Sequence, residues 1–284
     1  MRIGVSGAGG QLGNAIIAEL TKRTGNSSVV GISRSPENIQ ISVEGRRGDY
    51  NQPESLRSAY SGLDRLLIIP SPDLQPGIRG AQYITAINAA VTSGVEHIVL
   101  LSSVLAEPVE EPDIGASFWK AEQYLKENAK SWTILRMNYY AESFAQWASM
   151  LLGSGSSVLP GLGENRTAFV ARDDVAAAAA GILLGDGHAG ATYHATGEES
   201  VSGQARAALV SEISGKPLRF VVTTAERMSG ELALAGMSEV YVNAVIGIEQ
   251  HSVDGSYDIV TDDVERLTGR KPRAFRDVLS ACLK

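Results

Sequence analysis

The chain has 284 residues, of which 44% are hydrophobic and 20% are charged, a composition typical of a globular protein with a substantial core. Asp and Glu outnumber Lys and Arg by 32 to 25, and the resulting net charge of −7 argues against nucleic acid as a partner. Cys282 is the single cysteine, which excludes an intramolecular disulfide and favours a reducing compartment. No apolar run approaches the roughly 20 residues that span a membrane. We therefore expect a cytoplasmic protein without membrane or nucleic-acid partners.

Short aliphatic or β-branched runs alternate with stretches of helical spacing through the first half of the chain. The runs predict strands at about 2–6, 28–33, 44–48, 64–69, 96–101 and 132–136. The spacing between them predicts helices at 11–23, at 36–41, from Pro53 onward, at 76–93 and at 117–130. Because such alternation requires right-handed crossovers, it predicts an α/β fold with a doubly wound parallel sheet of the Rossmann type.

The alternation ends after Arg136, at a segment rich in Gly and Ser over 153–157. Beyond it the pattern predicts strand-like pieces near 167–170 and 192–195, a helix at 202–214, a strand at 220–223 and helix over most of 225–250. We place a soft boundary here, with a Rossmann domain at 1–152 and a smaller C-terminal α/β domain at 153–284. The alanine-rich helix at 173–185 is expected to return to the first domain, because small side chains allow close packing against a sheet.

The first predicted strand leads into a glycine-rich loop, with glycines at 7, 10 and 13, and then directly into a helix. Backbone N–H groups and the positive end of a helix converge in such a loop, where a dinucleotide pyrophosphate can bind. We therefore expect Gly7 and Gly10 to border a nucleotide. A plain tight turn is the alternative.

The second predicted strand ends at Arg34, without the Asp or Glu that would bind a ribose 2′-hydroxyl. Arg34 is placed to meet a 2′-phosphate, which favours NADPH over NADH, although a solvated arginine would also fit there. Asp49 follows the third strand and could accept from the adenine amino group or only begin a turn. Ser71 and Ser102 follow the next two strands at the same edge. They are expected to border the ribose and nicotinamide unless they are turn residues.

Four segments resemble the NmrA-like atypical short-chain dehydrogenases: residues 7–13, 48–56, 133–136 and 139–142. The resemblance is closest to bacterial NAD(P)H:quinone oxidoreductases of the second type and to triphenylmethane dye reductases. It implies a Rossmann domain plus a small substrate domain with the cleft between them, and the reduction of quinones or dyes. It also implies that NADPH binds at positions matching Gly7, Gly10, Gln11, Leu12, Arg34 and Asp49. The chain departs from these reductases at Met137, where they have Asn, and Asn138 is the candidate substitute.

Ordinary short-chain dehydrogenases use a Tyr-x-x-x-Lys pair to exchange a proton with substrate. Lys120 matches the lysine, but the tyrosine position is Ala116, and the flank that carries Lys120 could face the cleft or solvent. The missing acid argues against alcohol dehydrogenation and sugar epimerisation. A quinone or cationic dye accepts hydride at an electrophilic centre and can take its proton from water, so proximity would be the main catalytic device.

Aromatic residues after the sixth predicted strand could form the walls of a flat pocket for an aromatic acceptor. Tyr140 is the strongest candidate, and core packing is the alternative for each of these residues: Tyr139, Tyr140, Phe144, Trp147 and Phe169. The histidines at 97, 188, 194 and 251 lack the spacing of metal ligands, so we expect no metal site.

The sequence thus predicts an NADPH-dependent reductase of a quinone or another electrophilic aromatic acceptor, such as an azo or triphenylmethane dye. A non-catalytic NADP-binding redox sensor of the NmrA type stays open as the alternative, and a sugar-nucleotide epimerase is less favoured. A homodimer is compatible with this fold, although no residue pattern locates an interface.

Overall fold

The computed structural model describes residues 1–39 and 41–283. In this part of the chain one parallel sheet has the strand order β3-β2-β1-β4-β5-β6-β9. Its strands are β1 (Ile3–Ser6), β2 (Val29–Ser33), β3 (Glu44–Arg47), β4 (Arg65–Ile68), β5 (His97–Ser103), β6 (Trp132–Met137) and β9 (Ala191–Ala195). The predicted doubly wound α/β fold is confirmed, and the strand expected near 192–195 extends the sheet beyond β6. The order reverses between β1 and β4, which is where ligands bind in open α/β sheets.

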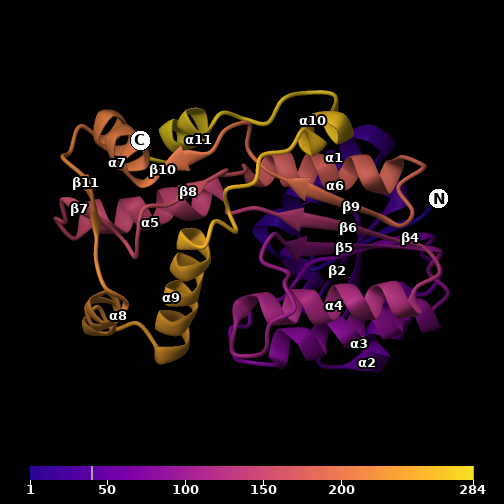
Figure 1. The fold of residues 1–284 in the computed structure, drawn as a ribbon. Helices are drawn as coiled ribbons and strands as arrows, with labels where there is room; N and C mark the ends of the chain where they lie inside the picture. The colour runs from indigo at the N-terminus through magenta and orange to yellow at the C-terminus, as the bar shows by residue number, and fades with distance from the viewer. Residues whose placement is uncertain (40, 284) are drawn as a thin grey trace.

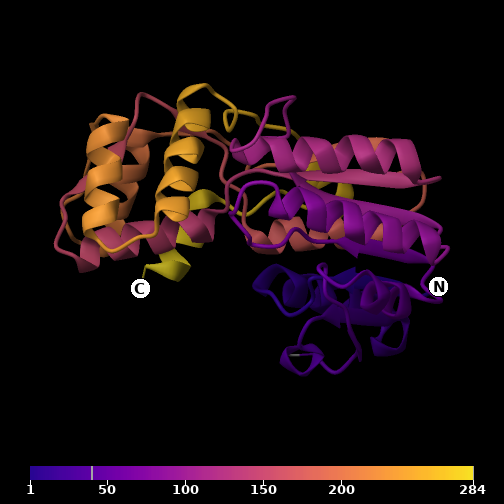
Figure 2. The ribbon, with the colours of Figure 1, turned by 90° about the horizontal axis from the view of Figure 1, so that it is seen from below.

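Helices cover both faces of the sheet (Figure 1). On one face lie α1 (Gln11–Thr24) and α6 (Arg172–Leu184), and on the other lie α2 (Pro53–Tyr60), α3 (Ile78–Thr92) and α4 (Ile114–Asn128). Figure 2, seen from below, shows α3 and α4 side by side. Of the helix expected at 36–41 the structure has a single 3₁₀ turn, Pro36–Asn38, and residue 40 lies outside the described residues.

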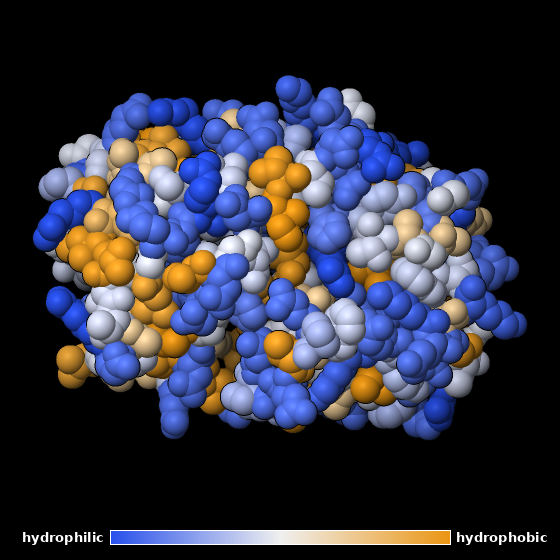
Figure 3. Space-filling view, in the orientation of Figure 1, coloured by the Kyte–Doolittle hydropathy of each residue, from blue (hydrophilic) through white to orange (hydrophobic). Residues whose placement is uncertain are grey.

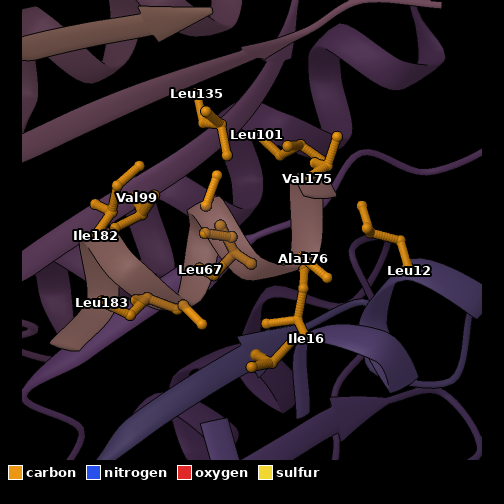
Figure 4. Packing of buried hydrophobic residues seen from close by; sticks show 14 of the residues in the cluster. Leu12, Ile16, Leu67, Val99, Leu101, Leu135, Val175, Ala176, Ile182 and Leu183 are labelled. Atoms are coloured by element: carbon orange, nitrogen blue, oxygen red, sulfur yellow. The ribbon is translucent and has the colours of Figure 1, made fainter. Parts of the chain in front are cut away.

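The core beneath α1 and α6 shows why an alanine-rich helix lies on this sheet. In Figure 4, Ile16 of α1 faces Ala176 of α6, and Leu67, Val99 and other strand residues fill the space between helix and sheet. Small side chains let α6 approach closely on more than one side. A Cβ at Gly181 would lie 2.3 Å from the carbonyl oxygen of Leu267, in α10 (Asp263–Thr268).

A separate hydrophobic cluster forms the other half of the molecule, around α5 (Ala141–Gly153), α7 (Gly203–Ser214) and α11 (Phe275–Cys282). Two short sheets accompany it: β7 (Val158–Gly161) pairs with β11 (Arg219–Val222), and β8 (Arg166–Thr167) pairs with β10 (Val201–Ser202). The helical stretch expected over most of 225–250 consists of two helices, α8 (Ala225–Leu234) and α9 (Glu239–Val253). The break contains Gly236. Its φ of 81° lies in the left-handed region and is incompatible with a right-handed α-helix.

The two halves differ at the surface. In Figure 3 the half with the large sheet is mostly hydrophilic, whereas hydrophobic residues gather at the end that carries α7, α8 and β11. Leu234 and Val222 are among the exposed hydrophobic residues there. No helix in the described residues is long and apolar enough to cross a membrane. The domain boundary near residue 152 stays a prediction; it falls near the end of α5, which packs in the second cluster.

Candidate active site

A cavity of about 900 Å³ opens at the carboxyl edge of the sheet, where the strand order reverses. It runs from the glycine loop after β1, past the ends of β2, β4, β5 and β6, to side chains from the second half of the molecule. Its volume is within the range of small-molecule and cofactor sites. Most of the residues expected to bind a dinucleotide lie in this one cavity: Gly7, Gly10, Gln11, Leu12, Arg34, Asp49 and Ser71.

The glycine loop is shaped by close backbone contacts. Gly7 has a φ of 95°, and a Cβ there would lie 2.9 Å from Cβ of Ile69. A Cβ at Gly13 would lie 2.4 Å from the carbonyl oxygen of Gly7. The amides of Gly7 and Ala8 both donate to the carbonyl oxygen of Ile32 at 3.0 Å. Gly7 and Gly13 therefore make the turn and the helix contact, and the Gly7 amide is engaged by β2.

The start of α1 presents unpaired amides to the cavity. Gln11, Leu12 and Gly13 line it, and as the first residues of the helix their N–H groups have no acceptor four residues back. Gly10 is the N-cap, and a Cβ there would meet only the Gly7 carbonyl oxygen, at 3.6 Å. Bare backbone and a positive helix end thus face open space, which fits a pyrophosphate.

The end of β2 provides a cation on the same cavity. Arg34 is exposed, lines the cavity with Ser33 and Ser35, and forms no ion pair within the described residues. By contrast, Arg46 of the neighbouring strand pairs with Glu44 at 2.7 Å. Arg34 is consequently available to an anionic ligand group.

The next two loops combine a turn role with a position on the cavity. Asp49 lines the cavity while its Oδ1 accepts from the amide of Asn51 at 2.9 Å, as in an aspartate-stabilised turn. Ser71 also lines the cavity, and its hydroxyl donates to Oε1 of Gln82. The contacts of Asp49 and Ser71 are therefore compatible both with a role in the turn and with a role in ligand binding.

Ser102 and Lys120 are not brought to the cavity. Ser102 is fully buried, and its hydroxyl donates to Oε1 of Glu122 at 2.6 Å. Ser103 lines the cavity in its place, because neighbouring residues of a strand point to opposite faces. Lys120 is exposed, while Phe118 of the same helix lines the cavity. The flank of α4 that carries Lys120 thus faces solvent.

The far end of the cavity is aromatic. Tyr139 and Tyr140 both line it, and burial raises the pKa of Tyr139 to about 12 and raises that of Tyr140 as well. The Tyr140 hydroxyl contacts Sδ of Met137 at 2.8 Å, and the Arg172 guanidinium lies 5.3 Å from its ring centroid. Both phenols are therefore protonated near neutral pH and can donate a hydrogen bond but cannot act as bases.

The other predicted aromatic residues stand behind this wall. Phe144, Trp147 and Phe169 line a smaller cavity of about 30 Å³, and Phe169 packs edge-on against Tyr139 with ring centroids 5.7 Å apart. Core packing is thus the better description of these three residues.

Sequence reasoning missed several lining residues. Arg79 and Gln82 of α3 form a polar wall, and Ile248 of α9 and Tyr257 approach from the second half. One local signal pointed to Arg79: a cation in the first turn of a helix opposes the helix dipole. Ile248 and Tyr257 carry no comparable signal, because only the tertiary fold brings them to the sheet edge.

Within the described residues no group of three His, Cys, Asp or Glu side chains could hold a metal ion.

Comparison with known proteins places the chain in a family. A family model described as NAD(P)H-binding matches residues 7–185, which include the glycine loop, the strands from β2 to β6, and α6. The chain belongs to this NAD(P)H-binding family. It is 31% identical to quinone oxidoreductase 2 of Escherichia coli over 222 residues, which are 77% of this chain and 76% of that protein.

Two further relatives match nearly the whole length of this NAD(P)H-binding family member. The chain is 27% identical to the NAD(P)H azoreductase of Xenophilus azovorans over 98% of this chain and 96% of that protein. Its structure is similar to Citrobacter triphenylmethane reductase complexed with NADP(H), with a TM-score of 0.90, 28% identity and coverage of 99% and 100%. The resemblance to the NmrA-like group of reductases is confirmed.

Proposed function

We propose that the protein is an NADPH-dependent reductase that transfers hydride to a quinone or another electrophilic aromatic acceptor, such as an azo or triphenylmethane dye. The observation that carries this proposal is the single cavity that joins a dinucleotide-type glycine loop and Arg34 to an aromatic end formed by Tyr139 and Tyr140. The names of the relatives, a quinone oxidoreductase, an azoreductase and a triphenylmethane reductase, support the same acceptor class.

The residues on the glycine side of the cavity fit NADPH. The amides of Gln11 and Leu12 would hold the pyrophosphate beside Gly10, and Arg34 would bind the 2′-phosphate through charge-assisted hydrogen bonds. Asp49 would border the adenine, and Ser71 would border the ribose and nicotinamide. When bound, NADPH supplies the hydride.

The chain's own contribution to the reaction is orientation of the acceptor and exclusion of water. Tyr140 and the edge-to-face pair of Tyr139 and Tyr257, with ring centroids 5.6 Å apart, would hold a flat acceptor against the cofactor. Ala116 is buried where ordinary short-chain dehydrogenases have tyrosine, and Lys120 is exposed, so the Tyr-x-x-x-Lys proton exchange is not supported. Water would protonate the reduced acceptor.

Turnover with an acceptor panel tests this proposal. We expect NADPH oxidation, followed by its absorbance, in the presence of benzoquinones, naphthoquinones, an azo dye or a cationic triphenylmethane dye. Tight NADPH binding without turnover of any acceptor would favour the redox-sensor alternative. Conversion of a UDP-sugar would favour an epimerase instead.

Replacement of Arg34 tests the choice of cofactor. In Arg34→Asp the new carboxylate repels a 2′-phosphate and can accept from a ribose 2′-hydroxyl, so the dissociation constant for NADPH should rise by about 10- to 100-fold while NADH binding improves. Isothermal calorimetry with both nucleotides measures this. Arg47→Asp is the matched control, because Arg47 is exposed at the end of β3 but does not line the cavity. Unchanged NADPH affinity in Arg34→Asp would contradict the assignment.

We further propose that the chain acts as two domains on either side of the acceptor, divided near residue 152, with α6, β9 and α10 packed in the first domain and α5 packed in the second. The lining residues support this, since Ile248 and Tyr257 come from the second segment. The homodimer and the cytoplasmic location stay predictions.

A further inference from the structure

Arg79 is a buried cation whose hydrogen-bonding edge faces the cavity. Its side chain is only 8% exposed, it lines the cavity, and it belongs to α3, on the face of the sheet opposite α1. Its Nε donates to the carbonyl oxygen of Ser71 at 3.2 Å, and its guanidinium carbon lies 5.2 Å from the centroid of the Phe118 ring. In the described residues no protein acceptor pairs with its two terminal nitrogens, and no carboxylate lies within 4.0 Å.

Two other arginines donate to the protein from at least one terminal nitrogen. Arg206, 7% exposed, donates to Asn165 and Thr167. Arg136 forms a two-point ion pair with the buried Glu122. The terminal nitrogens of Arg79 are not among the enclosed, unpaired polar atoms of the described residues, so they are accessible from the cavity and can donate to a partner from outside the chain.

A hydrogen-bonded wall fixes the direction of Arg79. Ser71, which accepts from Arg79 through its carbonyl oxygen, donates through its hydroxyl to Gln82, and Nε2 of Gln82 donates to Oδ1 of Asn51 at 3.2 Å. Phe118 covers one face of the guanidinium. The free edge with the two terminal nitrogens is therefore held in place before any ligand binds.

The groups around Arg79 act on its charge in opposite directions. Arg79 lies in the first turn of α3, where the helix end adds its own partial positive charge. Burial lowers the pKa of the guanidinium, whereas the carboxylates of Asp73 and Glu111 act in the opposite direction from beyond ion-pair distance. These two acids favour the charged form without occupying its donors.

We propose that the two terminal nitrogens of Arg79 bind an oxygen of the acceptor and stabilise the negative charge that forms there when a quinone is reduced, an inference that rests on the proposed function. With the hydride, one quinone oxygen gains a proton and the quinone gains two electrons, while the nicotinamide is oxidised. One quinone oxygen becomes a hydroxyl, and the other becomes a phenolate, which Arg79 holds until water protonates it. Arg79 thereby takes the place of the absent tyrosine as the group that contacts an oxygen of the acceptor.

This role separates two classes of acceptor. A quinone develops negative charge on oxygen, which a preorganised guanidinium stabilises. A cationic triphenylmethane dye takes the hydride at carbon and becomes neutral, so no oxyanion forms. Arg79 should therefore accelerate quinone reduction selectively.

Kinetics of Arg79 variants test the selectivity. We expect Arg79→Gln to lower kcat for a naphthoquinone by roughly 10²-fold, as for loss of an oxyanion donor, with the NADPH dissociation constant and dye reduction unchanged. Arg79→Lys keeps the charge but loses the forked donors. Its kcat for the naphthoquinone should lie between those of the wild type and Arg79→Gln. Arg227→Gln, at an exposed position of α8, is the control. Equal losses with quinone and dye, or a loss of NADPH affinity that accounts for the rate, would overturn the proposal.

A binding experiment tests Arg79 without turnover. The probe is 4-nitrophenol, whose ionisation is visible in its absorption spectrum, added to the wild-type protein saturated with NADP⁺. We expect the bound phenol to ionise at lower pH than the free phenol, and this shift to be lost in Arg79→Gln. An unshifted titration in the wild type overturns the proposal even if the variant fails to fold. A wild type that reduces dyes but no quinone would retain the proposed reductase function and exclude this role of Arg79.

Discussion

Single residues at the site owe their chemistry mainly to burial. Desolvation raises the pKa of several tyrosines in and around the cavity: Tyr50, Tyr60, Tyr83, Tyr139, Tyr140 and Tyr257. Some of these hydroxyls are also hydrogen-bonded in the interior; Tyr50 donates to the carbonyl oxygen of Ile69 at 2.8 Å. A site lined by neutral phenols suits an apolar acceptor and does not provide a base.

These tyrosines predict how stability depends on pH. A buried phenol with a raised pKa keeps its proton in the native state, while the unfolded chain begins to lose it above the ordinary value of 10. The contribution of Tyr139 is therefore fully present below pH 10 and is lost as pH rises from 10 to about 12. Urea unfolding between about pH 9 and about pH 12 should show falling stability.

Tyr139→Phe checks the assignment of this slope. The variant removes one ionisable group, so its stability should fall less steeply with pH than that of the wild type. Tyr241→Phe, at an exposed position of α9, serves for comparison. An identical slope in Tyr139→Phe and the wild type would disprove the contribution of Tyr139.

At the scale of elements, the join between β1 and α1 separates packing from binding. Gly13 is needed where the helix touches the loop, since a Cβ there would lie 2.4 Å from the Gly7 carbonyl oxygen and 2.6 Å from Cα of Ala8. Gly10 has no such neighbour on the protein side, with only the Gly7 carbonyl oxygen at 3.6 Å. Gly13 is therefore needed for the packing of the fold, whereas Gly10 leaves open the space in front of the helix.

Two alanine variants distinguish these roles. Gly13→Ala should destabilise the protein by about 1–3 kcal/mol, because α1 must move away from the loop. Gly10→Ala should change stability by less than about 1 kcal/mol but raise the NADPH dissociation constant at least about tenfold, because its methyl group enters the space for the phosphates. Urea unfolding and calorimetry measure the two quantities. Wild-type NADPH affinity in Gly10→Ala would remove the support for a phosphate site at this helix end.

At the scale of the whole molecule, the cavity depends on how α9 meets α4, which stands beside it in Figure 1. Nε2 of the buried His251 lies 3.1 Å from Oδ1 of Asp113, the residue that caps α4 by accepting from the Gly115 amide at 2.7 Å. A hydrophobic cluster that includes Leu105 and Tyr257 packs beside this contact. The contact therefore connects the half that carries the glycine loop to the half that completes the acceptor wall.

His251→Ala tests that connection. Without the imidazole, α9 and its Ile248 should be held less firmly, and KM for the acceptor should rise by about 3- to 10-fold, the equivalent of one hydrogen bond. NADPH affinity should not change, because the glycine loop is made by other elements. His97→Ala is the matched control, since His97 is also hydrogen-bonded, to Ser131 and Thr133, but does not line the cavity. A parallel rise in KM in both variants would indicate a general loss of stability.

The sequence by itself determined the parts of this protein that depend on neighbours along the chain. Alternating apolar runs specified the strands from β1 to β6, and the glycine spacing specified the turn before α1, because hydrophobic period and backbone freedom are local properties. The absence of an Asp or Glu after β2, together with Arg34, indicated the cofactor. These positions also lie close together along the chain. Short elements such as α10 and β10 were not predicted, because a few residues are too short a stretch to show a hydrophobic period.

Only the tertiary structure decided which side chains reach the cavity. One step along β5 separates buried Ser102 from Ser103 at the cavity, and one flank of α4 separates solvent-facing Lys120 from Phe118. Packing also brings β9 to the sheet after more than fifty intervening residues, and it brings Tyr257 to the site. The orientation of a side chain, and contacts between distant segments, follow from how layers pack on one another, which local sequence does not contain.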